Sequence, residues 1–103
     1  FPSHGNFAAM LAEYGSAQAM LDAVYAPGFH KLDQWQIQKF AQVLLRAKVS
    51  LYSELSPAQA RQAHLTPIGD LNAYLRQRVN ELGADTPIAV LPEGPMTIPY
   101  LIQ

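Results

Sequence analysis

The side chains best suited to recognise a ligand lie in one short run, Asp33-Gln34-Trp35-Gln36-Ile37-Gln38. A Trp side chain buries a large apolar area but needs a partner for its indole N–H, so it favours half-wet sites. Gln offers donors and acceptors without charge, which suits a hydroxyl or a carboxylate. Two interpretations stay open. Trp35 lines a pocket, with Gln34 and Asp33 positioning the helix, or it anchors the core while the Gln side chains face water.

A second candidate site is the run His4-Gly5-Asn6, which precedes an apolar-periodic segment. Free backbone N–H groups at the start of a helix can hold an anion. The alternative is an ordinary turn in which Asn6 serves as the helix N-cap. Ligands of open α/β sheets also bind beyond the carboxyl ends of the strands, and two predicted strands end here at Tyr52-Ser53-Glu54 and at Pro92-Glu93-Gly94.

The histidines are too scattered to suggest a metal site. His4, His30 and His64 are the only ones, and no two are four residues apart on one helix. The chain has no Cys, which removes thiolate ligands and Cys nucleophiles. It has no glycine-rich phosphate loop and no nucleophile-elbow motif. We therefore assign no catalytic residue and no metal ligand within this sequence.

Composition excludes several classes of partner. The 103 residues include 7 Lys and Arg against 8 Asp and Glu, a net charge of -1. Nucleic-acid binding depends on an excess of basic residues, and so does a polybasic membrane anchor. No apolar stretch approaches the ~20 residues of a membrane span. Charged residues make up 15% of the chain, which is low for a soluble domain and indicates a face made for contact. The lack of Cys suits a cytoplasmic location.

The elements that would position these side chains are mainly helices. Apolar residues recur with a helical period over 7–14 and 17–25, where Ser16 is the predicted N-cap of the second helix. A third helix runs from Asp33, paired with Gln36 in a capping box, to about residue 47, with apolar residues covered on more than one side. Two further helices are predicted, a short one over 57–64 and a longer one over 71–82.

Two strands complete the predicted fold, at 49–53 and 88–91, with Thr66-Pro67-Ile68-Gly69 as a loop and the tail after residue 96 extended. The order α-α-α-β-α-α-β predicts a helix-rich α/β chain with a small parallel sheet. A sheet of two strands is marginal by itself. We therefore expect residues 1–103 to be part of a larger α/β domain.

Several motifs in this order resemble a known family, the nickel-pincer lactate racemases, in its C-terminal part. That family contains racemases and epimerases of 2-hydroxy acids. The most specific match is the segment from Asp33 to Gln38. The matching segments are His4-Gly5-Asn6-Phe7, Pro27-Gly28, Asp33–Gln38, Val49–Ser53 and Ala89–Pro95.

The resemblance implies a fold, a cofactor and a chemistry for the full-length protein. Family members have two α/β domains with the active site between them, and a nickel-pincer mononucleotide tethered to a Lys. In that family, the cofactor takes hydride from the substrate α-carbon and returns it to the opposite face of the same carbon. Two His serve as acid and base at the substrate hydroxyl. The matching positions for that Lys and those His are upstream of this sequence. Of the family's pocket residues only its Trp matches here, at Trp35, as a wall of the substrate or cofactor pocket.

Two hypotheses follow from the sequence. In the first, the chain is the C-terminal segment of a 2-hydroxy-acid racemase or epimerase, is inactive alone, binds no cofactor by itself, and has the N-terminal remainder of that protein as its partner. In the second, it is a non-catalytic interaction domain that associates with itself, as a homodimer, through sheet edges or the Met96–Ile102 tail. The identity of the 2-hydroxy acid is not encoded in these residues.

Overall fold

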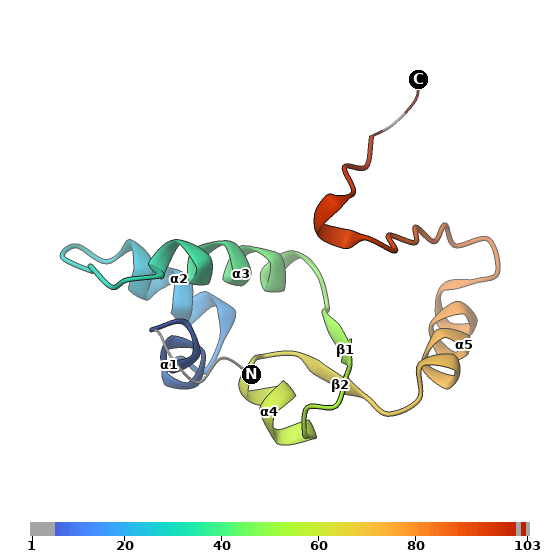
Figure 1. The fold of residues 1–103 in the computed structure, drawn as a ribbon, viewed down its shortest axis with the longest axis horizontal. Helices are drawn as coiled ribbons and strands as arrows, with labels where there is room; N and C mark the ends of the chain where they lie inside the picture. Colours follow the sequence, from blue (N-terminus) through green and yellow to red (C-terminus); the bar gives the residue numbers. More distant parts are fainter. Residues whose placement is uncertain (1–5, 101, 103) are drawn as a thin grey trace. The chain divides into compact units, whose positions relative to one another are not determined.

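The computed structural model describes residues 6–100 and 102. The chain forms two compact units, Phe1–Leu71 and Asn72–Gln103. No helix in the described part is both long and apolar enough to cross a membrane. The predicted class, a helix-rich α/β chain with a small parallel sheet, is confirmed (Figure 1). In order, the elements are α1 (Asn6–Glu13), α2 (Ala17–Tyr25), α3 (Gln34–Arg46), β1 (Ser50–Tyr52), α4 (Pro57–Gln62), β2 (Thr66–Ile68), α5 (Leu71–Leu82) and a 3-10 turn, η1 (Gly94–Met96).

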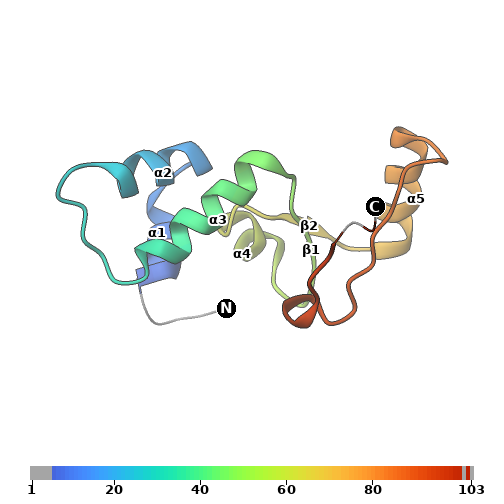
Figure 2. The ribbon, with the colours of Figure 1, turned by 90° about the horizontal axis from the view of Figure 1, so that it is seen from above.

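The core of the first unit lies between its first three helices. α2 and α1 both pack on α3, and Figure 2 shows α2 and α3 side by side as in Figure 1. The rings of Phe7 and Phe40 pack edge to face, with their centroids 5.9 Å apart. The apolar residues predicted for α1 and α2 supply most of this core, as the helical period requires. The buried cluster is Met10, Leu11, Met20, Leu21, Val24, Ile37, Ala41 and Ala63.

α3 is covered on one side only, which corrects the prediction of a broadly buried helix. Ile37 and Ala41 are buried, whereas Val43 and Leu45 are each 50% exposed. The helices of the first unit meet α3 along a single stripe, so the apolar residues outside that stripe face solvent.

Two of the predicted helix caps form, at α2 and α4, and the one predicted at α1 does not. Ser16 caps α2, because its Oγ accepts from the Ala19 N–H at 3.1 Å. Ser56 and Gln59 form the full capping box at α4, with both reciprocal hydrogen bonds present. Asn6, predicted as an N-cap, is instead the first residue of α1.

The sheet pairs β1 with β2 in parallel, with Ser50 opposite Thr66 and Tyr52 opposite Ile68. The segment predicted as a loop is therefore a strand. Pro67 has no N–H to donate to a ladder, so its presence indicates a loop. A strand with one free edge tolerates it. α4 provides the crossover that parallel strands need, so the order becomes α-α-α-β-α-β-α.

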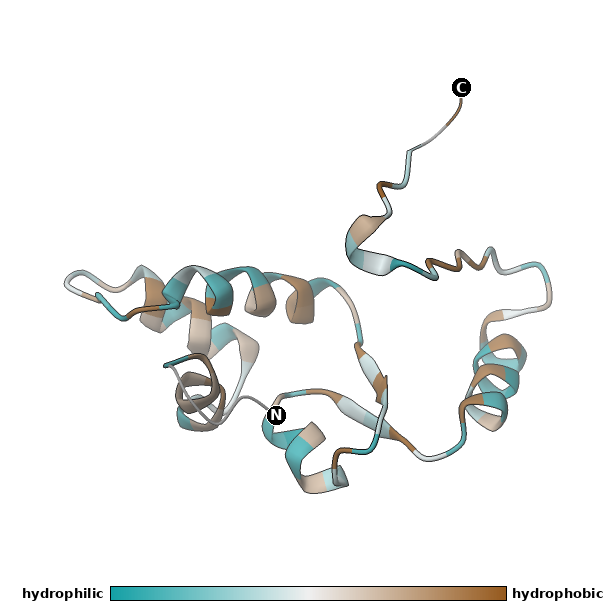
Figure 3. Cartoon of the chain, viewed as in Figure 1, coloured by the Kyte–Doolittle hydropathy of each residue, from teal (hydrophilic) through white to brown (hydrophobic). Residues whose placement is uncertain are grey.

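The predicted strand at 88–91 is wrong. These residues carry no strand assignment, and Ile88 and Val90 are 65% and 78% exposed. The run has the apolar character of a buried strand, but within the described residues β1 and β2 pair only with each other and give it no ladder to join. Figure 3 shows apolar residues, in brown, along this segment and along α5.

The second unit consists of most of α5 and the segment after it. α5 ends where predicted, at Gly83, whose φ of 104° suits glycine at the position after a helix. No residue of α5 is buried. Its apolar stripe borders a small cavity of about 100 Å³ within the unit, lined by Leu75, Arg78, Val79, Leu82, Thr86 and Ile88.

Candidate functional site

The predicted pocket residues sit at a tight turn that starts α3. Asp33 holds the N-cap position with φ 69°, in the left-handed region, and its side chain makes no capping hydrogen bond. The capping box predicted with Gln36 is therefore absent. Gln34 closes the turn in its place, because its Oε1 accepts from the Lys31 N–H at 3.1 Å. A left-handed Asp costs free energy, which this turn offsets with its hydrogen bonds.

Trp35 lies on the outside of α3 and is 64% exposed. A Trp that anchors the core would be buried. The exposure of Trp35 in this unit therefore argues against the core-anchor interpretation, one of the two that the sequence left open. Exposure leaves the indole face and its N–H open to a partner. Its role as a pocket wall stays a prediction.

Two amide side chains follow Trp35 along the same face of α3. Gln38 and Gln42 are three and seven residues after Trp35, so the three share one side of the helix. Their Nε2 groups donate to the Tyr25 hydroxyl oxygen at 3.0 and 3.2 Å, respectively. Both amides thus tie the end of α2 to α3. Tyr25, which was predicted on the apolar face of α2, is 60% exposed.

The candidate anion-binding helix start is only partly described. His4 and Gly5 lie outside the described residues. Asn6 begins α1, and its side chain is exposed. The anion role of this run stays a prediction.

An ion pair fixes the loop before α3 to α1. The Lys31 ammonium lies 2.9 Å from a Glu13 carboxylate oxygen and 5.7 Å from the centre of the Phe29 ring. The hydrogen bond that the Lys31 ammonium donates to the Glu13 carboxylate, together with the charge of that carboxylate, raises the pKa of Lys31 above its ordinary value. Both side chains are partly exposed, so the pair orients this loop more than it stabilises the fold.

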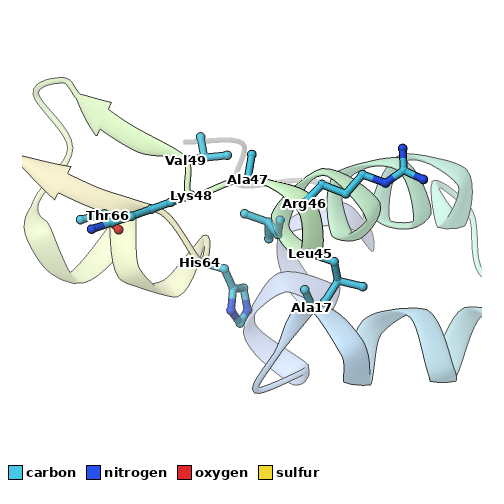
Figure 4. A pocket seen from close by; sticks show the side chains of 9 residues that line it. Ala17, Leu45, Arg46, Ala47, Lys48, Val49, His64 and Thr66 are labelled. Atoms are coloured by element: carbon cyan, nitrogen blue, oxygen red, sulfur yellow. The ribbon is translucent and has the colours of Figure 1, made fainter. Parts of the chain in front are cut away.

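A hollow of the first unit lies elsewhere, and the sequence did not indicate it. We call it the α3–β1 hollow: an open depression of about 510 Å³ where the end of α3 meets the starts of β1 and β2. It therefore sits at the amino ends of the strands, opposite to the Tyr52-Ser53-Glu54 rim that parallel sheets favour. Its lining residues are Ala17, Leu44, Leu45, Arg46, Ala47, Lys48, Val49, His64 and Thr66 (Figure 4).

His64 is held rigidly in the wall of this hollow. Its Nε2 lies 3.0 Å from the Leu11 carbonyl oxygen, and because a carbonyl only accepts, Nε2 carries the proton. Leu11 is in the last turn of α1, where carbonyls have no partner within the helix. The His64 backbone has φ 59°, in the left-handed region that few residues other than Gly adopt. No periodicity or motif could have revealed this position, since it depends on a contact across 53 residues.

The described residues gather no metal ligands. No group of three or more His, Cys, Asp or Glu side chains among residues 6–100 and 102 could hold a metal ion. His30 and His64 belong to separate places in the chain: His30 is an exposed loop residue, whereas His64 bonds to α1.

Comparison with known proteins gives one match. The family model for the lactate racemase C-terminal domain matches residues 3–98 of the 103. No curated protein and no solved structure matches the chain.

Proposed function

This chain belongs to the lactate racemase C-terminal domain family, and we propose that it is the C-terminal part of a racemase or epimerase of 2-hydroxy acids. The family match carries the proposal, because it covers residues 3–98 and includes the Asp33–Gln38 segment. Alone, the chain would be inactive, since the resemblance puts the catalytic His pair and the cofactor-bearing Lys in segments upstream of it.

A nickel-pincer cofactor is part of the proposal for the full-length protein only. The described residues do not fit a nickel site, because they bring no three metal ligands together. No catalytic step is therefore assigned to them. The ligand set and the acid and base groups would come from the N-terminal remainder.

The contribution proposed for this chain is one wall of the active-site cleft. Trp35 would present its indole to the substrate or cofactor, excluding water on one side and offering a single N–H donor. Gln34 and Asp33 would fix the turn from which Trp35 projects, since Gln34 bonds to Lys31 and Asp33 starts the helix. The exposure of Trp35 supports this role, because a wall must be reachable.

The N-terminal remainder is the proposed partner of the second unit. α5 buries no residue, and Val90, Met96 and Ile98 are each more than three-quarters exposed. Apolar surface of this kind is characteristic of a contact face. Self-association of the chain is the second candidate, favoured by the same exposed side chains and by the free edges of the two-stranded sheet.

Enzyme assays of the full-length protein test the first proposal. The cofactor-loaded protein is offered a panel of 2-hydroxy acids, and inversion of at least one is expected. Trp35→Phe should lower turnover with little change in melting temperature. The matched control is Ile37→Val in the same helix, which should cost stability and leave turnover unchanged. No inversion of any substrate would count against the racemase.

Light scattering tests self-association of the chain itself. A concentration-dependent increase in mass is expected if the exposed apolar face pairs with a second copy, whereas a well-folded monomer at all concentrations would rule this out. A cytoplasmic location also belongs to the proposal. It rests on the lack of Cys in the sequence, and fractionation of cells expressing the full-length protein would test it.

A further inference from the structure

The α3–β1 hollow has the volume of a small-molecule site and a lining of mixed polarity. Its volume of about 510 Å³ is within the range of pockets that hold small ligands. Apolar side chains, among them Leu45 and Ala17, form part of the lining (Figure 4). A ligand with an apolar portion could cover Leu45, which is otherwise 50% exposed.

The charge at the edge of the hollow is of one sign. Every fully charged lining residue is basic, and no Asp or Glu contributes to the lining. Figure 4 distinguishes the two cations: Lys48 runs toward Thr66, whereas Arg46 points away along α3. Neither makes an ion pair within the described part of the chain. Lys48 and the Thr66 hydroxyl thus leave a donor pair at one end of a depression that also has apolar side chains in its lining.

We propose that the α3–β1 hollow binds a short-chain carboxylate, with the carboxylate at Lys48 and Thr66 and the hydrocarbon chain over Leu45 and Ala17. A single ammonium with one hydroxyl matches a singly charged carboxylate better than a phosphate, whose charge is about −1.5 to −2. The site is separate from Trp35, which does not line the hollow. The proposal is therefore independent of racemase activity.

A simpler explanation of the two cations has to be separated from this proposal. Basic residues commonly follow the C-terminus of a helix, where they offset the negative end of its dipole. Arg46 and Lys48 would serve that purpose equally, because both are at the end of α3. Carboxylate binding, in contrast, requires Lys48 and not Arg46. The pair therefore supplies a matched control.

The test is an NMR titration of the 103-residue chain with hexanoate, acetate and 1-hexanol at constant ionic strength. Hexanoate should give saturable shifts at residues 45–49 and 64–66 and bind more tightly than acetate or 1-hexanol. Lys48→Gln should weaken hexanoate binding about two- to fivefold, as for one exposed charge pair, while Arg46→Gln leaves it unchanged. Leu45→Ala should weaken hexanoate but not acetate.

Three results would overturn the proposal: absence of saturation, equal binding of hexanoate and either analogue, or equal losses from the Lys48 and Arg46 variants. The last result would mean that only the charge at the end of α3 matters. Lys48 and Arg46 are both exposed, so their substitution should leave the spectrum of the free chain intact. Lys48→Met provides a second variant of similar length, with the same expected loss of hexanoate binding.

Discussion

Replacing His64 by Ala and by Gly separates its two structural features, the bond to Leu11 and the left-handed backbone. Either change removes the Nε2–H donor at 3.0 Å from the Leu11 carbonyl oxygen, a loss of about 1 kcal/mol. Ala keeps the cost of φ 59°, while Gly relieves it by about 1–2 kcal/mol. We expect His64→Ala to destabilise the chain by about 1 kcal/mol and His64→Gly to be nearly neutral.

Urea unfolding followed by circular dichroism measures both variants, and equal slopes would show that the unfolded states are comparable. The order of the two variants is decisive. At an ordinary position Ala is more stabilising than Gly by about 0.5–1 kcal/mol, so a left-handed position reverses the sign. His64→Ala equal to or more stable than His64→Gly would refute the strained-backbone argument. A neutral His64→Ala would refute the contribution of the Leu11 bond.

Three further predictions concern individual contacts. Ile37→Ala should cost about 2–5 kcal/mol in urea unfolding because Ile37 is fully buried, whereas Trp35→Ala should cost clearly less; equal losses would mean that Trp35 is covered after all. Ser56→Ala removes the cap of α4 and should cost about 1 kcal/mol in thermal unfolding, and an unchanged melting temperature would contradict the capping box. Glu13→Gln should return the pKa of Lys31 toward its ordinary value in an NMR titration, because the Glu13 carboxylate is what raises it; an unmoved titration would show that the pair does not form in solution.

Features set by neighbouring residues could be predicted from the sequence. The capping box of Ser56 and Gln59 depends on a spacing of three residues, and it forms as expected. The buried face of α2 follows its helical period, and Gly83 ends α5. Two local signals are exceptions. Asn6, predicted as an N-cap, is the first residue of α1, and the other exception is Asp33. Its type and spacing indicate a cap, but Gln34 takes the hydrogen bond from Lys31 and the Asp33 side chain makes no capping bond.

Features set by distant contacts could not be predicted in this way. Thr66 to Ile68 form a strand only because Ser50 to Tyr52 lie beside them. Pro67 in the middle of this segment argues against a strand when only the sequence is considered. Ile88 to Leu91 have the composition of a strand, yet the part of the chain that the structure describes pairs no strand with them. The same limit applies to the candidate sites: the exposure of Trp35 and the position of His64 in the α3–β1 hollow both depend on how the helices assemble.

The long separation between His64 and Leu11 bears on how the chain folds. The three helices of the core follow one another directly, so their contacts require only short loops to close. The His64 contact spans 53 residues, and closing a longer loop costs more chain entropy. We expect this contact to form after the rate-limiting barrier. Its removal would then accelerate unfolding and leave the refolding rate almost unchanged. The bond therefore slows the unfolding of the native state.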